Sequence, residues 1–470
     1  MRKESFVDKF IRGFSYAFLL NVLLLISKII YSFFLPKLLS VESFGYWQLY
    51  FLYAGLIHFC HLGLVDGIYL VHGGRNYSEL NKRNLGGQFG ILVILGFLIS
   101  TTLFIITQVI ISDLDQWYVI LIVCIDIIFF VPRALLSTVF QMTGMIKKYS
   151  YSLLSEVLIS FFIVVSMLFM GVRDFKLLIL GDCIARIGSL IVSIYNANGG
   201  IRFLIPTYND IIDSTKYIKI GVFLLFSNMI SILTISSVRL IVESAWGIQT
   251  FSFVSLALSI SNILIFAIGA ASIVLFPILK RVSAAELAKI YNALNYILFF
   301  FLSFCLLMYY PISLVLVWWL PKYSVSFYYL GIVAPMCLFE MQLSLVGYTC
   351  MKILRKEKSI FSINIKALCI ILILCYLIVH YQLSVEYILI LLILQAVYKV
   401  CCVHYLLNCE WEKSNWRCVF FSVLCAIFFE LFCLYIGGIH GFLYFLLIVS
   451  IFFIIERSSL WNAIKYLRSI

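Results

Sequence analysis

Residues 86–110 read GGQFGILVILGFLISTTLFIITQVI. The stretch has no charged residue, and Lys82 and Arg83 precede it while Asp113 follows it. A helix needs about 20 largely apolar residues to cross the hydrocarbon core of a bilayer, which is about 30 Å thick. The stretch therefore predicts a transmembrane helix.

The whole chain has the composition of a membrane protein. Of its 470 residues, 64% are hydrophobic and 12% are charged, against roughly 45 to 50% and 25% in soluble domains. Comparable apolar stretches recur between charged or turn-forming residues, and they predict an all-α polytopic protein of about fourteen transmembrane helices, near 14–35, 44–70, 86–110, 117–139, 151–170, 175–195, 218–241, 250–276, 292–319, 326–350, 359–381, 385–407, 416–436 and 439–455. Twelve or thirteen spans stay possible, because the last two stretches, joined at Gly437-Gly438, also fit one helix plus an interfacial segment.

The distribution of basic residues predicts the orientation, because Lys and Arg accumulate in short cytoplasmic loops. With the N-terminus inside, the outer loops hold only Lys37, Arg173, Lys176 and Lys322, and most other basic residues lie in inner segments. Both termini are therefore predicted to be cytoplasmic, in the inner membrane of a bacterium. The net charge of +12 suits anionic lipid headgroups. No nucleic-acid motif is present, so nucleic acid is not an expected partner.

The N-terminal segment and the cysteines give further indications about the class of protein. The first apolar stretch ends in Leu35-Pro36-Lys37 without a small-residue cleavage site, which predicts a retained helix and not a signal peptide. The 14 cysteines lie mostly within spans and show no framework spacing, so no disulfide is expected. The group Cys401, Cys402, His404 and Cys409 falls on a helix end, and we expect no metal site and no cofactor.

A polar interruption at 196–216 divides six predicted helices from the next six. It predicts an N-lobe at 1–198, a cytoplasmic linker at 199–216, a C-lobe at 217–408, and two further helices with a cytoplasmic tail at 409–470. Because six is even, the lobes would enter the membrane in the same orientation, as parallel repeats.

Several segments between about residues 10 and 400 carry a family likeness. They are FLPKLLSVESFGYWQLYFLYAGLIHFCHLGLVDGIYL at 34–70, the segment 217–281, WWLPKYSVSFYYLGIVAP at 318–335, and Phe140-Gln141 at the end of the fourth predicted helix. In their order and spacing they resemble the polysaccharide-transport branch, which includes the O-antigen flippases, of the multidrug, oligosaccharidyl-lipid and polysaccharide exporter superfamily. The chain departs from that pattern at Val238, before Arg239, where relatives often have an acidic residue.

Charged residues within spans are the candidates for transport, because a Lys or Arg at the bilayer centre costs roughly 2.5 to 3.5 kcal/mol and usually faces a cavity or a partner. Asn21, Lys28 and Ser32 lie on one face of the first predicted helix, and Asn228 and Arg239 lie eleven residues apart on the seventh. We expect these faces to line water, with Lys28, Arg239, Asn21 and Asn228 binding substrate. Snorkelling to the outer interface is the alternative for both basic residues.

The fourth predicted helix places Asp126, Arg133 and Ser137 on one side, and Pro132 frees backbone carbonyls beside Arg133. We expect Arg133 to bind substrate and Asp126 to serve coupling or gating. Glu340 is a second coupling candidate, with a hydrogen bond to a neighbour as the alternative.

Three further charged groups have simpler interpretations. Asp182 and Arg186 are four residues apart, the spacing of an intrahelical ion pair, and we expect a structural pair. Lys366 lies near the cytoplasmic start of its helix and is expected to snorkel. Lys399 is deeper and is a minor candidate.

The resemblance implies a transporter and not an enzyme: a flippase that moves an undecaprenyl-pyrophosphate-linked oligosaccharide, an O-antigen unit or similar, from the cytoplasmic to the outer leaflet by alternating access. Coupling to H⁺ or Na⁺ stays open, and a polysaccharide polymerase and the chain-length machinery are the implied protein partners. The alternatives are a drug or cation antiporter or a lipid II flippase of the same superfamily, and a membrane polysaccharide polymerase. The sugar, the coupling ion and the oligomeric state are not determined by the sequence.

The predicted topology is testable with single cysteines and an impermeant thiol reagent. Ser40→Cys, Asp113→Cys and Lys322→Cys should be labelled in intact cells, because these positions lie in predicted outer loops. Lys82→Cys and Lys356→Cys should be labelled only after permeabilisation. Labelling of position 82 in intact cells would reverse the orientation.

Overall fold

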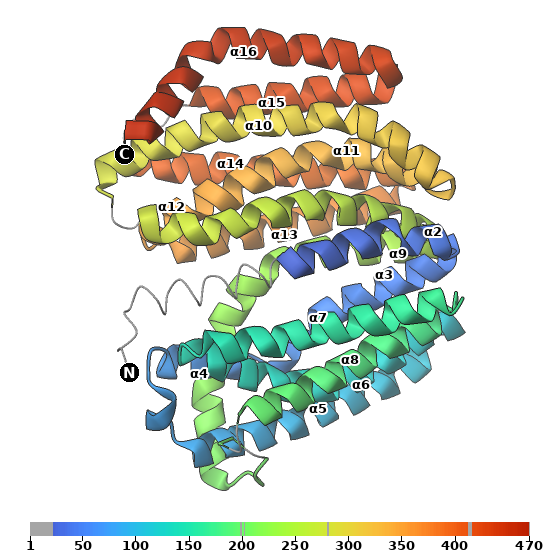
Figure 1. Ribbon diagram of the computed structural model, residues 1–470, viewed down its shortest axis with the longest axis vertical. Helices are drawn as coiled ribbons and strands as arrows, with labels where there is room; N and C mark the ends of the chain where they lie inside the picture. Colours follow the sequence, from blue (N-terminus) through green and yellow to red (C-terminus); the bar gives the residue numbers. More distant parts are fainter. Residues whose placement is uncertain (1–21, 198–199, 202, 280–281, 412–415, 470) are drawn as a thin grey trace. The chain divides into compact units, whose positions relative to one another are not determined.

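The computed structural model describes residues 22–197, 200–201, 203–279, 282–411 and 416–469. The regular structure in these ranges is helical and contains no strand, which confirms the predicted all-α polytopic class (Figure 1). Helices satisfy their backbone hydrogen bonds internally, which a chain in hydrocarbon requires. The chain forms two compact units, Met1–Ser236 and Ser237–Ile470.

The first unit contains a helix over 22–33 and then α2 to α8, with the beginning of α9. The bounds of its elements are Leu35–Leu38 for α2, Val41–Leu56 for α3, Ile57–His61 for the 3₁₀-helix η1, Leu64–His72 for α4, Tyr77–Glu79 for the 3₁₀-helix η2, Lys82–Ile110 for α5, Leu114–Met142 for α6, Ile146–Phe169 for α7 and Phe175–Asn196 for α8. Helix α9, Tyr208–Leu279, passes from the first unit into the second.

The second unit continues with α10 to α16. The bounds are Ala284–Trp319 for α10, Pro321–Tyr323 for the 3₁₀-helix η3, Ser324–Met341 for α11, Gln342–Gly347 for the π-helix η4, Tyr348–Ile353 for α12, Glu357–His380 for α13, Val385–Trp411 for α14, Trp416–Leu431 for α15, Phe432–Ile436 for the π-helix η5 and Gly438–Ser469 for α16. The division between the units falls inside α9, whereas the sequence predicts a linker at 199–216. The relation of the lobes as parallel repeats stays a prediction.

Eleven helices in the described residues are long and apolar enough to cross a membrane, or twelve if the pair 41–61 and 64–72, bent by 57°, forms one span. The sequence predicts about fourteen, and two features account for the difference from twelve. Helix α9 counts once, although Gly247 leaves the helical conformation with φ 79° and ψ 174° between the predicted spans 218–241 and 250–276. The predicted span 14–35 is described only from residue 22. Both C-terminal candidates, 416–436 and 438–466, qualify.

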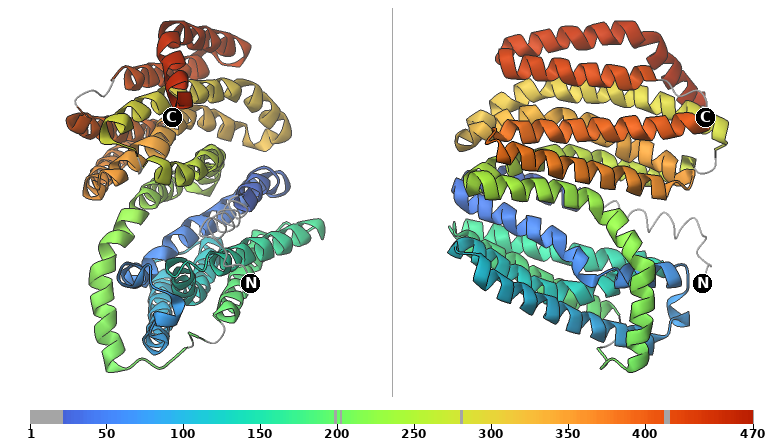
Figure 2. Two further views of the ribbon diagram at one scale, coloured as in Figure 1. Left: turned by 60° about the vertical axis from the view of Figure 1, so that its left-hand side comes forward. Right: turned by 180° about the vertical axis from the view of Figure 1, so that it is seen from behind.

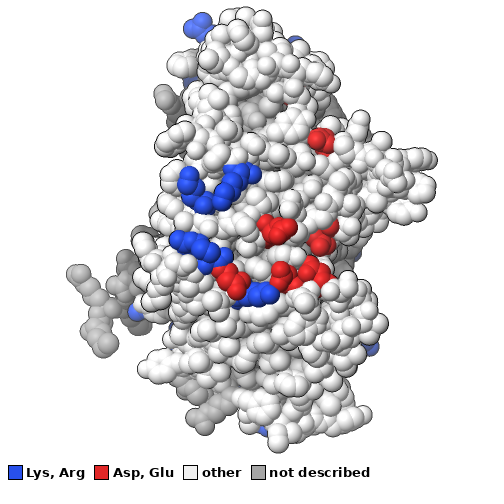
Figure 3. Space-filling view, turned by 90° about the vertical axis from the view of Figure 1, so that its right-hand side faces the viewer, with Lys and Arg blue, Asp and Glu red and all other residues white. Residues whose placement is uncertain are grey.

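Few charged side chains interrupt the surface. On the face drawn in Figure 3 they gather in small groups, and the rest of that face is uncharged. Figure 2 shows the long helices of each unit packed side by side. The lipid around them is as apolar as leucine, so their packing depends on van der Waals contact and on polar contacts between helices.

Helix α6 is the core of the first unit. It packs against α3, α4, α5, α7 and α8, and it is buried more deeply than α5 or α7. Its side chains Val131, Leu135 and Val139 have no exposed surface. In the second unit α11 has the corresponding place and packs against α10, α14 and α15. Asp126 and Arg133, polar residues in the middle part of α6, are therefore held inside protein.

Short polar side chains at the turns fix where helices begin. Ser40 accepts a hydrogen bond from the Ser43 amide before α3, and Asp113 accepts one from the Asp115 amide before α6. Such caps satisfy amide groups that have no partner within the helix. The turn residues between apolar runs therefore set the bounds of the spans.

Helices α4 and α9 cross at glycines. A Cβ atom on Gly67 would lie 2.0 Å from the carbonyl oxygen of Tyr217, and one on Gly221 would lie 2.0 Å from the carbonyl oxygen of Gly63. Gly63 itself has φ +85°, a left-handed conformation that glycine adopts without strain. The two backbones approach this closely because neither helix has a side chain at the crossing.

We expect Gly67→Ala and Gly221→Ala to destabilise the first unit, by about 1 to 3 kcal/mol if the helices shift as in other overpacked cores. The measurement is the unfolding temperature of the purified protein in detergent. Gly55→Ala is the matched control, because a Cβ atom at Gly55 meets nothing within 4 Å. Equal unfolding temperatures for Gly67→Ala and Gly55→Ala would contradict the close crossing.

Candidate functional site: a buried charged network

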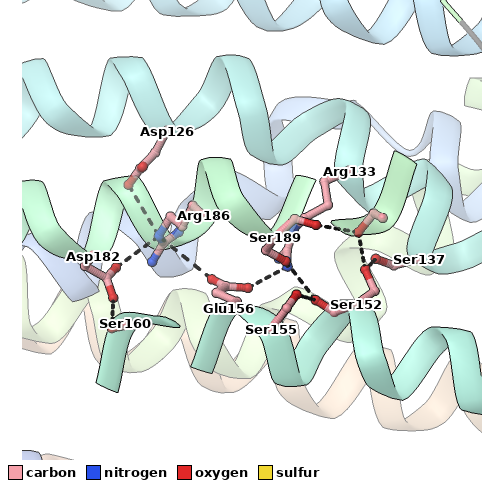
Figure 4. A network of polar contacts seen from close by, with 11 residues as sticks. Asp126, Arg133, Ser137, Ser152, Ser155, Glu156, Ser160, Asp182, Arg186 and Ser189 are labelled. Atoms are coloured by element: carbon pink, nitrogen blue, oxygen red, sulfur yellow. Dashed lines mark hydrogen bonds and ion pairs between the residues drawn. The ribbon is translucent and has the colours of Figure 1, made fainter. Parts of the chain in front are cut away.

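A polar network lies among α6, α7 and α8 in the first unit (Figure 4). Helix α6 contributes Asp126 and Arg133, which are seven residues apart and share one face. Helix α8 contributes Asp182 and Arg186, and α7 contributes Glu156. Glu156 is partly exposed and the other four side chains are buried. Helix packing thus concentrates charge at one place inside the unit.

Arg186 is the centre of this network. Its Nε lies 3.1 Å from Asp182 Oδ2, 3.5 Å from Asp126 Oδ2 and 3.9 Å from Glu156 Oε1. Its guanidinium group also lies over the ring of Tyr50 on α3, 5.5 Å from the ring centre. The predicted pair of Asp182 and Arg186 is confirmed, and it is part of a larger set of contacts across four helices.

The hydroxyl group of Tyr50 joins two of the carboxyl groups. It lies 2.7 Å from Asp126 Oδ2 and 2.8 Å from Asp182 Oδ2. A phenol has one hydrogen to donate, so both contacts are hydrogen bonds only when one carboxyl group also carries a proton. Ser160 on α7 donates to the other oxygen of Asp182 at 2.5 Å.

Arg133 organises the other end of the network. Its Nη1 lies 2.6 Å from Glu156 Oε2 and donates to Ser189 Oγ at 2.7 Å. Ser189 in turn donates to the backbone carbonyl of Ser152 at 2.7 Å. The buried Nε of Arg133 has no hydrogen-bond partner among the described residues. The side of α6 predicted to hold Asp126, Arg133 and Ser137 therefore faces protein, where Ser137 lies 3.3 Å from Ser152.

The charges of the network do not balance. Three carboxyl groups, of Asp126, Glu156 and Asp182, face two guanidinium groups, of Arg133 and Arg186. An unpaired charge away from water is unfavourable by several kcal/mol in typical proteins. The arrangement is therefore suited to hold one proton in addition to its two arginines.

Glu340 belongs to a separate ion pair in the second unit. It extends from α11 and pairs with Lys399 of α14, and the Lys399 side chain is buried. The π-helix η4 begins two residues later at Gln342, and such π-turns inside helices are frequent at functional sites. The proposed coupling role of Glu340 stays a prediction.

The remaining predicted substrate residues lie outside both clusters. Lys28 is exposed on the helix over 22–33, and Asn228 is exposed on α9. Arg239 in the second unit donates from Nε to Ser255 at 3.1 Å and lies 5.1 Å from the centre of the Phe251 ring. Asn21 lies outside the described residues. Lys28 and Arg239 belong to different units, so their convergence on one phosphate stays a prediction.

Sequence reasoning missed Tyr50 and Glu156 as members of the network, and also the serines Ser152, Ser160 and Ser189. Glu156 lies within the predicted span 151–170, so the depth criterion that selected Asp126 would also have selected it. Tyr50 and Ser189 have no such signal, because tyrosine and serine are common in membrane helices. Their roles follow from contacts between helices that only the structure provides.

The part of the chain that the structure describes holds no group of three His, Cys, Asp or Glu side chains arranged for a metal ion. His404, from the sequence cluster near residue 401, instead lies with Nδ1 3.1 Å from the hydroxyl of Tyr291.

No family model and no curated protein matches the sequence. Solved structures do match. The lipid II flippase MurJ in an inward closed conformation is 14% identical, with a TM-score of 0.64, and the match covers 97% of this chain and all of that one. At this identity the likeness shows the fold alone.

Two further structures match less well. A MOP superfamily transporter from Pyrococcus furiosus is 11% identical over 85% of this chain and 93% of that one, with a TM-score of 0.44. A multidrug transporter of the MATE family, inward-facing, is 13% identical over 94% and 96%, with a TM-score of 0.42. The fold assignment therefore rests on the match to the lipid II flippase alone.

The charge imbalance gives a stability prediction. Arg186→Gln should destabilise the protein by about 3 to 5 kcal/mol, because it leaves buried carboxylates without a partner. Asp126→Asn should have a much smaller effect, because it removes the surplus negative charge and keeps an oxygen that accepts from Tyr50. The effects of both substitutions are measured as unfolding temperatures of the purified variants in detergent. Ser155→Ala is the control, because Ser155 lies at the edge of the network. If Asp126→Asn is as damaging as Arg186→Gln, the network does not carry a surplus charge.

Proposed function

We propose that this protein is a flippase that moves an undecaprenyl-pyrophosphate-linked oligosaccharide, an O-antigen or similar surface polysaccharide unit, from the cytoplasmic to the outer leaflet of a bacterial inner membrane. The observation that carries the proposal is the fold, which matches a lipid II flippase over nearly the entire length of both chains. The segments at 34–70, 217–281 and 318–335, which resemble O-antigen flippases, favour the polysaccharide substrate.

The physical difficulty for such a protein is to move a pyrophosphate and a hydrated sugar chain through hydrocarbon. A polar path between two lobes that alternate in access would lower that barrier, while the polyprenyl tail stays in lipid. Basic residues would hold the pyrophosphate. Lys28, which is exposed on its helix, and Arg239 are the candidates for this role. Asn228 and Asn21 are the further substrate-binding residues that the sequence predicts. Arg133 would join them only after its pair with Glu156 opens.

Coupling to H⁺ or Na⁺ is assigned to the carboxyl groups. Asp126 is favoured, because it belongs to a network with one more carboxyl than guanidinium group. Binding of a proton or a cation to the carboxyl group in excess would change the attraction among α3, α6, α7 and α8. Glu340, paired with Lys399, is the corresponding group of the second unit.

A lipid II flippase is the second candidate, favoured by the same structural match. Both lipids would present a pyrophosphate on a polyprenyl chain and differ in the saccharide. A drug antiporter fits less well, because basic residues dominate the proposed substrate site, and a cationic drug calls for negative charge. In the proposed setting a polymerase and the chain-length machinery would act on the exported unit.

Deletion of the gene distinguishes the two candidates. Accumulation of a surface-polysaccharide precursor on the cytoplasmic leaflet, with normal cell-wall synthesis, is the expected result. Accumulation of lipid II with arrested cell-wall synthesis would instead establish the second candidate. If neither lipid accumulates, the protein is not a flippase for either.

Lys28 tests the phosphate-binding role directly. Lys28→Ala should abolish surface polysaccharide at normal protein abundance, because the residue is exposed and its removal opens no cavity. Lys28→Arg should keep substantial export, because the positive charge is retained. Lys28→Met keeps the apolar stem and removes only the charge, so export by Lys28→Met at normal abundance would rule out phosphate binding. Surface polysaccharide and protein level are measured in the complemented deletion strain.

A further inference from the structure

A groove of about 280 Å³ opens between α13 and α14 in the second unit. Ser359, Ser362 and Lys366 line it from α13, at spacings of three and four residues that put them on one face. Helix α14 contributes Tyr398, Cys402 and Tyr405 at similar spacing. The volume lies just below the roughly 300 to 1,000 Å³ of pockets that enclose entire small molecules. A groove of this volume suits the headgroup of a lipid.

The groove holds an uncompensated positive charge. Lys366 is exposed and makes no hydrogen bond or ion pair with any described residue, whereas Lys399 and Lys356 pair with Glu340 and Glu410. The groove has no acidic residue in its lining. The hydroxyl groups of Ser359 and Ser362 also make no hydrogen bond to the described residues. One cation and two hydroxyl donors form a set that matches a phosphate.

The groove lies toward the basic end of these helices. Lys352, Arg355, Lys356 and Lys358 directly precede or begin α13, and the positive-inside rule predicts that this end is cytoplasmic. Lys366 is nine residues into α13, or about 14 Å along its axis. The long side chain of a lysine at this depth reaches toward the headgroups. The ligand should therefore come from the cytoplasmic leaflet.

We propose that this groove binds the phosphate of an anionic phospholipid from the cytoplasmic leaflet. Lys366 pairs with the phosphate, and Ser359 and Ser362 donate hydrogen bonds to its oxygens. Basic pockets between transmembrane helices on the cytoplasmic side bind anionic headgroups in other membrane proteins. A lipid fits better than a soluble phosphate compound, because Ile363 and Leu406 also line the groove and offer contact to an acyl chain. The proposal does not depend on the transported substrate.

The test uses the purified full-length chain and native mass spectrometry, with phosphatidylglycerol and phosphatidylcholine as probes. The wild-type protein should retain phosphatidylglycerol in preference to phosphatidylcholine. Lys366→Gln should lower the affinity for phosphatidylglycerol about fivefold, which corresponds to about 1 kcal/mol for one basic residue. Lys366→Arg should keep it. Lys358→Gln is the matched control, because Lys358 is exposed on the same helix and outside the groove.

Three results would overturn the proposal. The first is that Lys366→Gln binds phosphatidylglycerol as well as the wild type does. The second is that Lys358→Gln loses as much affinity as Lys366→Gln. The third is that excess inorganic phosphate displaces the lipid completely, which would identify a soluble phosphate as the ligand. The elution volume of each variant in size-exclusion chromatography confirms that it is folded.

Discussion

Charge inside hydrocarbon has to be neutralised by the protein itself, and in the first unit this is done around Arg186. Its guanidinium group reaches carboxyl groups from its own helix, from α6 and from α7, and it lies over the Tyr50 ring of α3. Lipid competes equally for the apolar faces of all these helices. The polar contacts therefore help to decide that α3, α7 and α8 are neighbours of α6.

In the second unit, the polar contacts that join the helices around α11 involve fewer charged residues. Its core helix α11 carries Glu340, paired with Lys399, and the following π-helix places Gln342 where its amide donates to Ser422 of α15 at 2.9 Å. The contact of Tyr291 with His404 adds a neutral pair between α10 and α14. These neutral hydrogen bonds join helices without adding charge.

Much of the fold follows from the sequence, because a span is a local property. An apolar run such as 86–110 is long enough to cross a bilayer wherever its neighbours lie, and α5 covers it. The pair of Asp182 and Arg186 was equally predictable, since four residues separate them on one helix. The break of α9 at Gly247 falls between the predicted spans 218–241 and 250–276, so it also follows from the sequence. The bend between α3 and α4 was not predictable, because it depends on how neighbouring segments pack. The contacts of Arg133 with Glu156 and Ser189 were also not predictable, because they join three helices whose order in space no local pattern encodes.

The single hydrogen of the Tyr50 hydroxyl has a mechanical consequence. It lies between Asp126 on α6 and Asp182 on α8, and without a further proton it can tie α3 to only one of them at a time. Addition of a proton lets both ties form at once, and its loss leaves two like charges beside one oxygen. The number of hydrogen bonds that join α3 to α6 and α8 thus depends on the protonation of this one site.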